Sequence, residues 1–96
     1  QLERALRESR AEFGPRDVRT LQVVDGIAGL RVEQSRYDTA EQGYRAVIDA
    51  LEATRRQSDP LYPKALGNLG NVYLQQERYA DADRLLRQAQ DAQARA

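Results

Sequence analysis

The residues best suited to recognising another molecule form a polar stripe that occurs twice. Its members are spaced by four, three and four residues, which places them on one face of a helix. The later set is Lys64, Asn68, Asn71 and Gln75. The earlier set, 42 residues before it, is Gln22, Gly26, Gly29 and Glu33. Asparagine and glutamine side chains both donate and accept hydrogen bonds, so they suit the backbone of a partner chain.

Two glycines in the earlier stripe weaken the helix but leave its surface open. Gly26 and Gly29 each lower helix stability by about 1 kcal/mol relative to alanine. In return they leave space for a bound chain. Asp25 and Gly67 flank the two stripes. The alternative is that all of these positions are ordinary solvated ones.

Catalytic residues do not gather in any recognisable pattern. The chain has no histidine and no cysteine, which removes the commonest general base and all thiol chemistry. The carboxylates are spread as surface charges among arginines, and the glycines of "GNLGN" lie inside a helical pattern. No metal-ligand spacing stands out. We therefore expect no enzyme activity, no cofactor and no metal in this segment.

Charge and hydropathy exclude further classes of partner. Fifteen basic and fifteen acidic residues cancel, so nothing attracts nucleic acid or an anionic membrane surface. No apolar run approaches the roughly 18 residues that cross a bilayer, and no signal peptide is visible. Cytoplasm is the default expectation. Because the chain starts at Gln1 and contains no methionine, we expect it to be a segment of a longer protein.

An internal repeat of 42 residues is the most informative feature. The stretch "VEQSRYDTAEQGYRAVIDA" at 32–50 aligns with "LQQERYADADRLLRQAQDA" at 74–92. Identical residues recur at seven positions of this alignment, including Tyr37 with Tyr79 and Ala40 with Ala82. A period of about 20–50 residues indicates a stacked array in which neighbouring repeats complete each other's core.

Apolar residues recur at helical spacing throughout, and strict alternation is missing, which predicts an all-α fold. We expect five helices, at about 1–12, 18–34, 37–56, 61–76 and 79–95. The breakers "FGPRD" and "SDPLYP" separate them, and Ser58 and Asp59 are the expected N-caps before Pro60. The chain then divides into 1–14, the second helix of an earlier repeat, followed by repeats at 18–56 and 60–96.

Residues 63–96 resemble a tetratricopeptide repeat. The residues that carry the resemblance are Leu66, Leu69, Gly70, Tyr73, Ala82, Leu86 and Ala89. Residues 21–54 match more loosely, because Arg31 stands where the family has tyrosine and Val47 where it has alanine. The 42-residue spacing looks like the longer variant of kinesin light chains and of many bacterial regulatory proteins.

This resemblance implies a right-handed α-solenoid of about two and a half repeats. Gly70 or Ala28, facing Ala82 or Ala40, would let paired helices approach closely. Four of the five tyrosines are then packing residues; they are Tyr37, Tyr44, Tyr73 and Tyr79. The family usually has glycine at the left-handed turn inside each repeat, where this chain has Ser35 and Glu77.

In this family the first helix of each repeat lines a concave groove that binds peptides or partner helices. The resemblance therefore implies a partner-binding face made of Gln22, Asp25, Gly29, Glu33, Lys64, Asn68, Asn71 and Gln75. Some members clamp a terminal carboxylate with lysine, arginine and asparagine. Asp25 and Gly29 replace the lysine and asparagine of that clamp here, which argues against it.

Three functions remain open. The favoured one is a protein-interaction scaffold that binds a peptide or partner helix. The second is a structural segment for homo-oligomerisation or for packing on another domain of its own chain. The third is a peptide-sensing regulatory module for an attached output domain.

The two ends of the array differ in polarity. Leu2, Leu6 and Phe13 lack a preceding partner helix, so we expect self-association through that end. In the last helix Gln90 and Gln93 replace Ile48 and Leu51 of the inner repeat, and a polar outer face suits a terminal repeat. We therefore expect the array to extend before residue 1 and to stop, or to change character, near residue 96.

Overall fold

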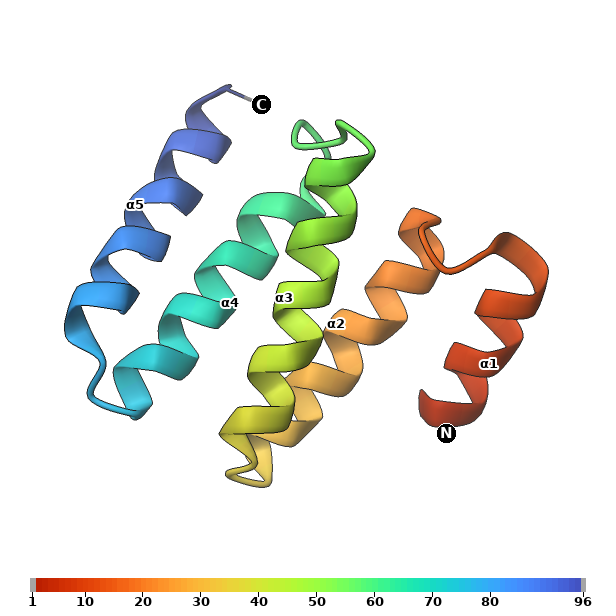
Figure 1. Cartoon of the computed structure of the whole chain (residues 1–96), viewed down its shortest axis with the longest axis horizontal. Helices are drawn as coiled ribbons and strands as arrows, with labels where there is room; N and C mark the ends of the chain where they lie inside the picture. The colour runs from red at the N-terminus through yellow and green to blue at the C-terminus, as the bar shows by residue number, and fades with distance from the viewer. Residues whose placement is uncertain (1, 96) are drawn as a thin grey trace.

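The computed structural model describes residues 2–95 and contains five helices in this range, without a strand. Figure 1 shows them side by side in chain order. Their bounds are α1 (Leu2–Phe13), α2 (Val18–Glu33), α3 (Tyr37–Ala53), α4 (Leu61–Gln75) and α5 (Tyr79–Arg95). The all-α prediction is confirmed, and four of the five expected helices agree with these bounds to within one residue.

The predicted end of α3 at residue 56 is wrong, because the helix ends at Ala53. Arg55 has φ of +56°, in the left-handed region. Its backbone N–H donates to Glu52 O, and the N–H of Arg56 donates to Leu51 O at 2.7 Å. These two bonds are the Schellman pattern, which satisfies the last carbonyls and ends a helix. Thr54 adds a hydroxyl bond to Ala50 O at 2.7 Å.

The same ending closes α2 and α4. Ser35 and Glu77 have φ of +59° and +63°, so the left-handed turn expected at these two residues is present without glycine. The following residue is arginine each time, and its N–H reaches back into the helix: Arg36 to Arg31 O and Arg78 to Tyr73 O, both at 2.8 Å. The hydrogen bonds of the cap thus offset the backbone strain of a left-handed non-glycine residue.

Aspartates begin the first helix of each repeat. The Asp17 carboxylate accepts from Arg19 N at 2.9 Å at the start of α2. The prediction of Ser58 and Asp59 as N-caps is wrong, because Pro60 is the N-cap of α4 and makes no side-chain cap bond. The Asp59 carboxylate, one residue before the N-cap, accepts from Leu61 N at 2.8 Å. Both bonds satisfy a backbone N–H that a helix start leaves without a partner.

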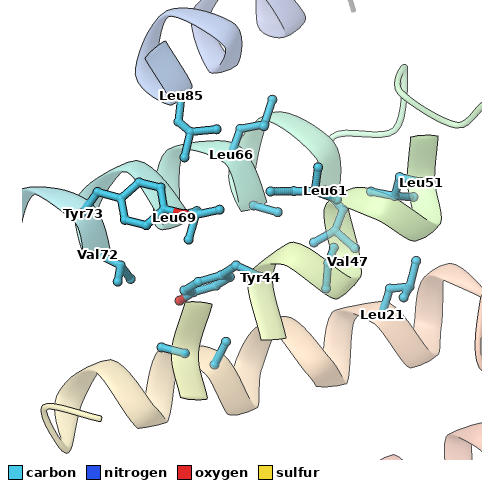
Figure 2. Packing of buried hydrophobic residues seen from close by; sticks show 14 of the residues in the cluster. Leu21, Tyr44, Val47, Leu51, Leu61, Leu66, Leu69, Val72, Tyr73 and Leu85 are labelled. Carbon is cyan, nitrogen blue, oxygen red and sulfur yellow. The ribbon is translucent and has the colours of Figure 1, made fainter. Parts of the chain in front are cut away.

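Each helix packs against the next one along the chain, and α2 also contacts α4. The molecule is a slab of 38 × 32 × 15 Å. Tyr44, Val47 and Leu51 of α3 lie in the core between α2 and α4 (Figure 2). One continuous core therefore runs from α2 to α5, and α1, which has no buried residue, covers its edge.

Small residues set the contact within each helix pair, with different partners in the two repeats. In the first repeat, a Cβ added at Gly43 would lie 3.0 Å from Ala28 Cβ. In the second, a Cβ at Gly70 would lie 2.9 Å from the Leu86 side chain and 3.5 Å from Ala82 O. The expected pairing of Gly70 with Ala82 is therefore present, and Gly43 provides the close approach to Ala28.

Three of the four tyrosines pack as expected and one does not. Tyr44 and Tyr73 are buried, and Tyr37 is half-buried against the core. Tyr79 is 63% exposed, so its prediction as a packing residue is wrong. Its equivalent, Tyr37, packs at α4, the first helix of the following repeat, and the described chain places no such helix beyond α5.

The ends show the expected difference in polarity at these residues. Leu2 is 38% exposed on α1. Gln90 and Gln93 of α5 are exposed, while Ile48 and Leu51 of α3 are buried. Self-association and the extent of the array remain predictions.

Candidate functional site

The two polar stripes lie on α2 and α4, and most of their side chains face solvent. Gln22 and Glu33 on α2 are exposed, as are Lys64, Asn71 and Gln75 on α4. Gly29 and Asn68 are half-buried. Asp25 is the exception, because it is only 5% exposed.

Asp25 joins the two stripes. Its Oδ2 lies 3.5 Å from Lys64 Nζ on α4. The carboxylate is nearly enclosed, while the lysine side chain extends into solvent. The ion pair fixes α2 beside α4 at the level of the stripes. Asp25 is thus a structural member of this face and not a freely solvated one.

Burial raises the pKa of Asp25 above its ordinary value, and Lys64 and the Asn68 amide partly oppose this shift. The second carboxylate oxygen, Oδ1, is buried without a hydrogen-bond partner. Burial of a carboxylate without full hydrogen bonding disfavours its charged form, which is why the pKa rises. The same charge raises the pKa of Tyr44 to about 12, with burial of the phenol as the larger cause.

The glycines of this face leave open space. A Cβ at Gly26 or Gly67 would meet nothing within 4 Å. At Gly29 it would lie 3.5 Å from Tyr44 Oη. The backbone is therefore open at Gly26 on α2 and at Gly67 on α4.

Gln75, like Lys64, is a stripe residue that already contacts another part of the chain. Tyr37 Oη donates to Gln75 Oε1 at 2.7 Å, from the start of α3 to the end of α4. The amide nitrogen of Gln75 retains both of its donors. Gln75 therefore combines a contact between repeats with a remaining capacity to bind.

The face holds hydrogen-bonding groups and no reactive constellation. Across residues 2–95, no three acidic, histidine or cysteine residues gather as a metal site. In that range no helix is long and apolar enough to cross a membrane.

Sequence reasoning missed several hollows outside this face, including these two. One, of about 470 Å³, lies between Tyr62 and the end of α5, beside Asp91 and Arg95. The other, of about 270 Å³, lies between α1 and α3 above α2, and we call it the α1–α3 hollow. The signal for the second was present in the repeat alignment, since Gly43 aligns with Leu85.

Comparison with known families agrees with this architecture. The tetratricopeptide repeat model matches residues 25–95, which is most of the chain. No curated protein matches the chain. The chain belongs to the tetratricopeptide repeat family, whose repeats generally mediate protein–protein interactions and form a non-catalytic scaffold.

Proposed function

We propose that this chain binds a peptide or a partner helix across the face formed by α2 and α4. The observation that carries the proposal is the contact from Asp25 to Lys64, which sets the two polar stripes side by side. Further along α4 from Lys64, Asn68 is half-buried and Asn71 is exposed. Their amides supply donors and acceptors to a partner backbone along two neighbouring helices.

A terminal carboxylate is a poor ligand for this face. A carboxylate clamp needs uncompensated positive charge, and Lys64 is the single cation of the two stripes. Asp25 already neutralises it. The partner is therefore recognised mainly through hydrogen bonds to its backbone, and its terminal charge contributes little.

The test uses a probe selected on the chain itself. A phage-displayed library of random peptides is panned on the 96-residue chain, and the enriched peptides are measured by titration calorimetry. Changing Asn68 and Asn71 together to alanine leaves partner groups unpaired at roughly 1–3 kcal/mol each. We expect binding to weaken about tenfold or more. Gln75 stays unchanged, because it also contacts Tyr37.

The control is a matched pair on an outer helix. Arg84 and Arg87 are exposed on α5, and changing both to alanine is expected to leave binding unchanged. If this control abolishes binding while the asparagine variant binds normally, the partner uses the outer helices. If no peptide is enriched, the proposed function fails.

The exposed side of α1 supports a second function, self-association. This helix has no buried residue and contacts α2 alone, and it exposes Leu2. Sedimentation velocity at several concentrations tests this function. A dimer that Leu2→Glu abolishes would support it, and a monomer at all concentrations would exclude it.

A further inference from the structure

A hollow on the side of the molecule formed by α1 and α3 results from a local difference between the two repeats. Leu85 of α5 is buried and belongs to the same core cluster as Leu66 of α4 (Figure 2). At the equivalent position of α3 the chain has Gly43, which lies over Val24 and Ala28 of α2. The space that Leu85 fills in the second repeat therefore has no side chain to fill it in the first.

The lining combines an apolar floor with two cations. Leu6, Val24 and Ile27 are half-buried there, whereas Leu66 and Leu69, the counterparts of Val24 and Ile27, are fully covered. Arg10 and Arg31 stand at the hollow, and none of its lining residues is acidic. Apolar surface left uncovered beside an unfilled space favours an aliphatic group from another molecule.

The surroundings of Arg31 indicate that a carboxylate can bind at the edge of the α1–α3 hollow. Its side chain is largely buried, and Nε has no hydrogen-bond partner. Nη2 lies 3.3 Å from Glu3 Oε2, and the Glu3 side chain is mostly exposed. A carboxylate therefore already occupies this edge, on a side chain that an incoming carboxylate can replace at little cost.

We infer that the α1–α3 hollow is a docking site for a partner peptide that presents a branched aliphatic side chain beside an acidic residue. The aliphatic group enters the hollow beside Gly43 and contacts Leu6, Val24 and Ile27. The acidic residue pairs with Arg10 and, in competition with Glu3, with Arg31. This site is separate from the α2–α4 face and does not depend on the function proposed there.

The probe is the peptide acetyl-Ala-Glu-Leu-Glu-Ala-amide, followed by ¹⁵N NMR on the whole chain. We expect saturable shifts at the amides of Val24, Ile27 and Gly43. A peptide with glutamine in place of both glutamates is expected to bind several-fold more weakly, and one with alanine in place of leucine is expected not to bind. Shifts confined to Asn68 and Asn71 would assign the peptide to the other face and overturn the inference.

Three variants test the site itself. Ala46 is exposed at the hollow, and Ala46→Leu is expected to block it and to weaken binding about tenfold. Ala80→Leu makes the same change at an exposed position of α5 and is expected to leave binding unchanged. Glu3→Gln releases Arg31 and is expected to tighten binding about twofold to fivefold.

The results of these variants distinguish the apolar part of the inference from the acidic part. Wild-type binding by Ala46→Leu, with an unchanged melting temperature, would exclude the hollow. Unchanged binding by both Glu3→Gln and Arg10→Gln would exclude the acidic part of the inference. The double change of Asn68 and Asn71 to alanine tests only the α2–α4 face. If that variant still binds the enriched peptides normally, the proposed function fails and the inference about the α1–α3 hollow stands, so the two proposals are tested independently.

Discussion

Equivalent residues of the two repeats have different surroundings, and Asp25 is the clearest case. Its counterpart, Gly67, adjoins open space, whereas Asp25 is enclosed between α2 and α4 with one carboxylate oxygen unpaired. Lys64 compensates part of the cost of burying the charge. The folded state is therefore more stable when the Asp25 carboxyl group is neutral than when it is charged.

This gives a pH prediction with a definite sign. Because burial raises the pKa of Asp25 in the folded state, the folded chain binds its proton more tightly than the unfolded chain does. The resulting stability is complete below the ordinary pKa of 3.8 and is lost as pH rises through the raised value. Relative to Asp25→Asn, the wild type is therefore expected to gain stability as pH falls.

Urea unfolding of the wild type and Asp25→Asn at pH 7, 5 and 3 provides the measurement. Asp49→Asn, at an exposed position of α3, is the control for general acid effects. A wild type that loses stability relative to Asp25→Asn on acidification would contradict the assigned cause.

At the scale of the elements, small residues govern how closely helices pair. Gly43 lies against Ala28 in the contact between α2 and α3. Ala28 Cβ cannot rotate away from a new methyl group, so the helices themselves would have to move apart. Gly67 faces open space on α4. The same substitution at these two positions therefore has opposite consequences.

Gly43→Ala is expected to destabilise the chain, because overpacking typically costs about 1–3 kcal/mol and exceeds the gain in helix propensity of about 1 kcal/mol. Gly67→Ala meets no obstacle and is expected to stabilise it by up to about 1 kcal/mol. Chemical unfolding of the two variants gives the comparison. Equal stabilisation by both would mean that α2 and α3 do not approach closely at Gly43.

At the scale of the whole molecule, Tyr73 links the two repeats. Its hydroxyl accepts from Arg45 Nη2 and donates to Glu41 Oε2, each at 2.7 Å, and both partners are on α3. The Arg78 guanidinium, at the turn before α5, lies 4.1 Å from the centre of the Tyr73 ring. Repeat arrays depend on such contacts between neighbours for their cooperativity.

Tyr73→Phe is therefore expected to lower the free energy of unfolding by about 1–2 kcal/mol, since hydrogen bonds to charged groups are stronger than neutral ones. It is also expected to broaden the unfolding transition as the repeats uncouple. The control is Tyr37→Phe, which removes the exposed bond to Gln75 and is expected to cost less. A larger loss for Tyr37→Phe would place the main link elsewhere.

The sequence by itself determined the helices, their pairing and the family. Helical spacing and the 42-residue period depend on local backbone geometry and on repetition, and both can be read along the chain. The family resemblance gave the position of the turns at Ser35 and Glu77, and the structure shows that both residues are left-handed. The third left-handed residue, Arg55, was not predicted, because neither a glycine nor a change in the apolar pattern marks it.

The tertiary structure decided the surroundings of individual side chains. The stripe residues were predicted as one face, but only the packing of α2 on α4 buries Asp25 and pairs it with Lys64. Tyr79 repeats Tyr37 in sequence and is nevertheless exposed, because burial depends on the neighbouring helix. The α1–α3 hollow likewise requires three helices in place around Gly43. Burial and electrostatic pairing arise between elements, so spacing along one element cannot specify them.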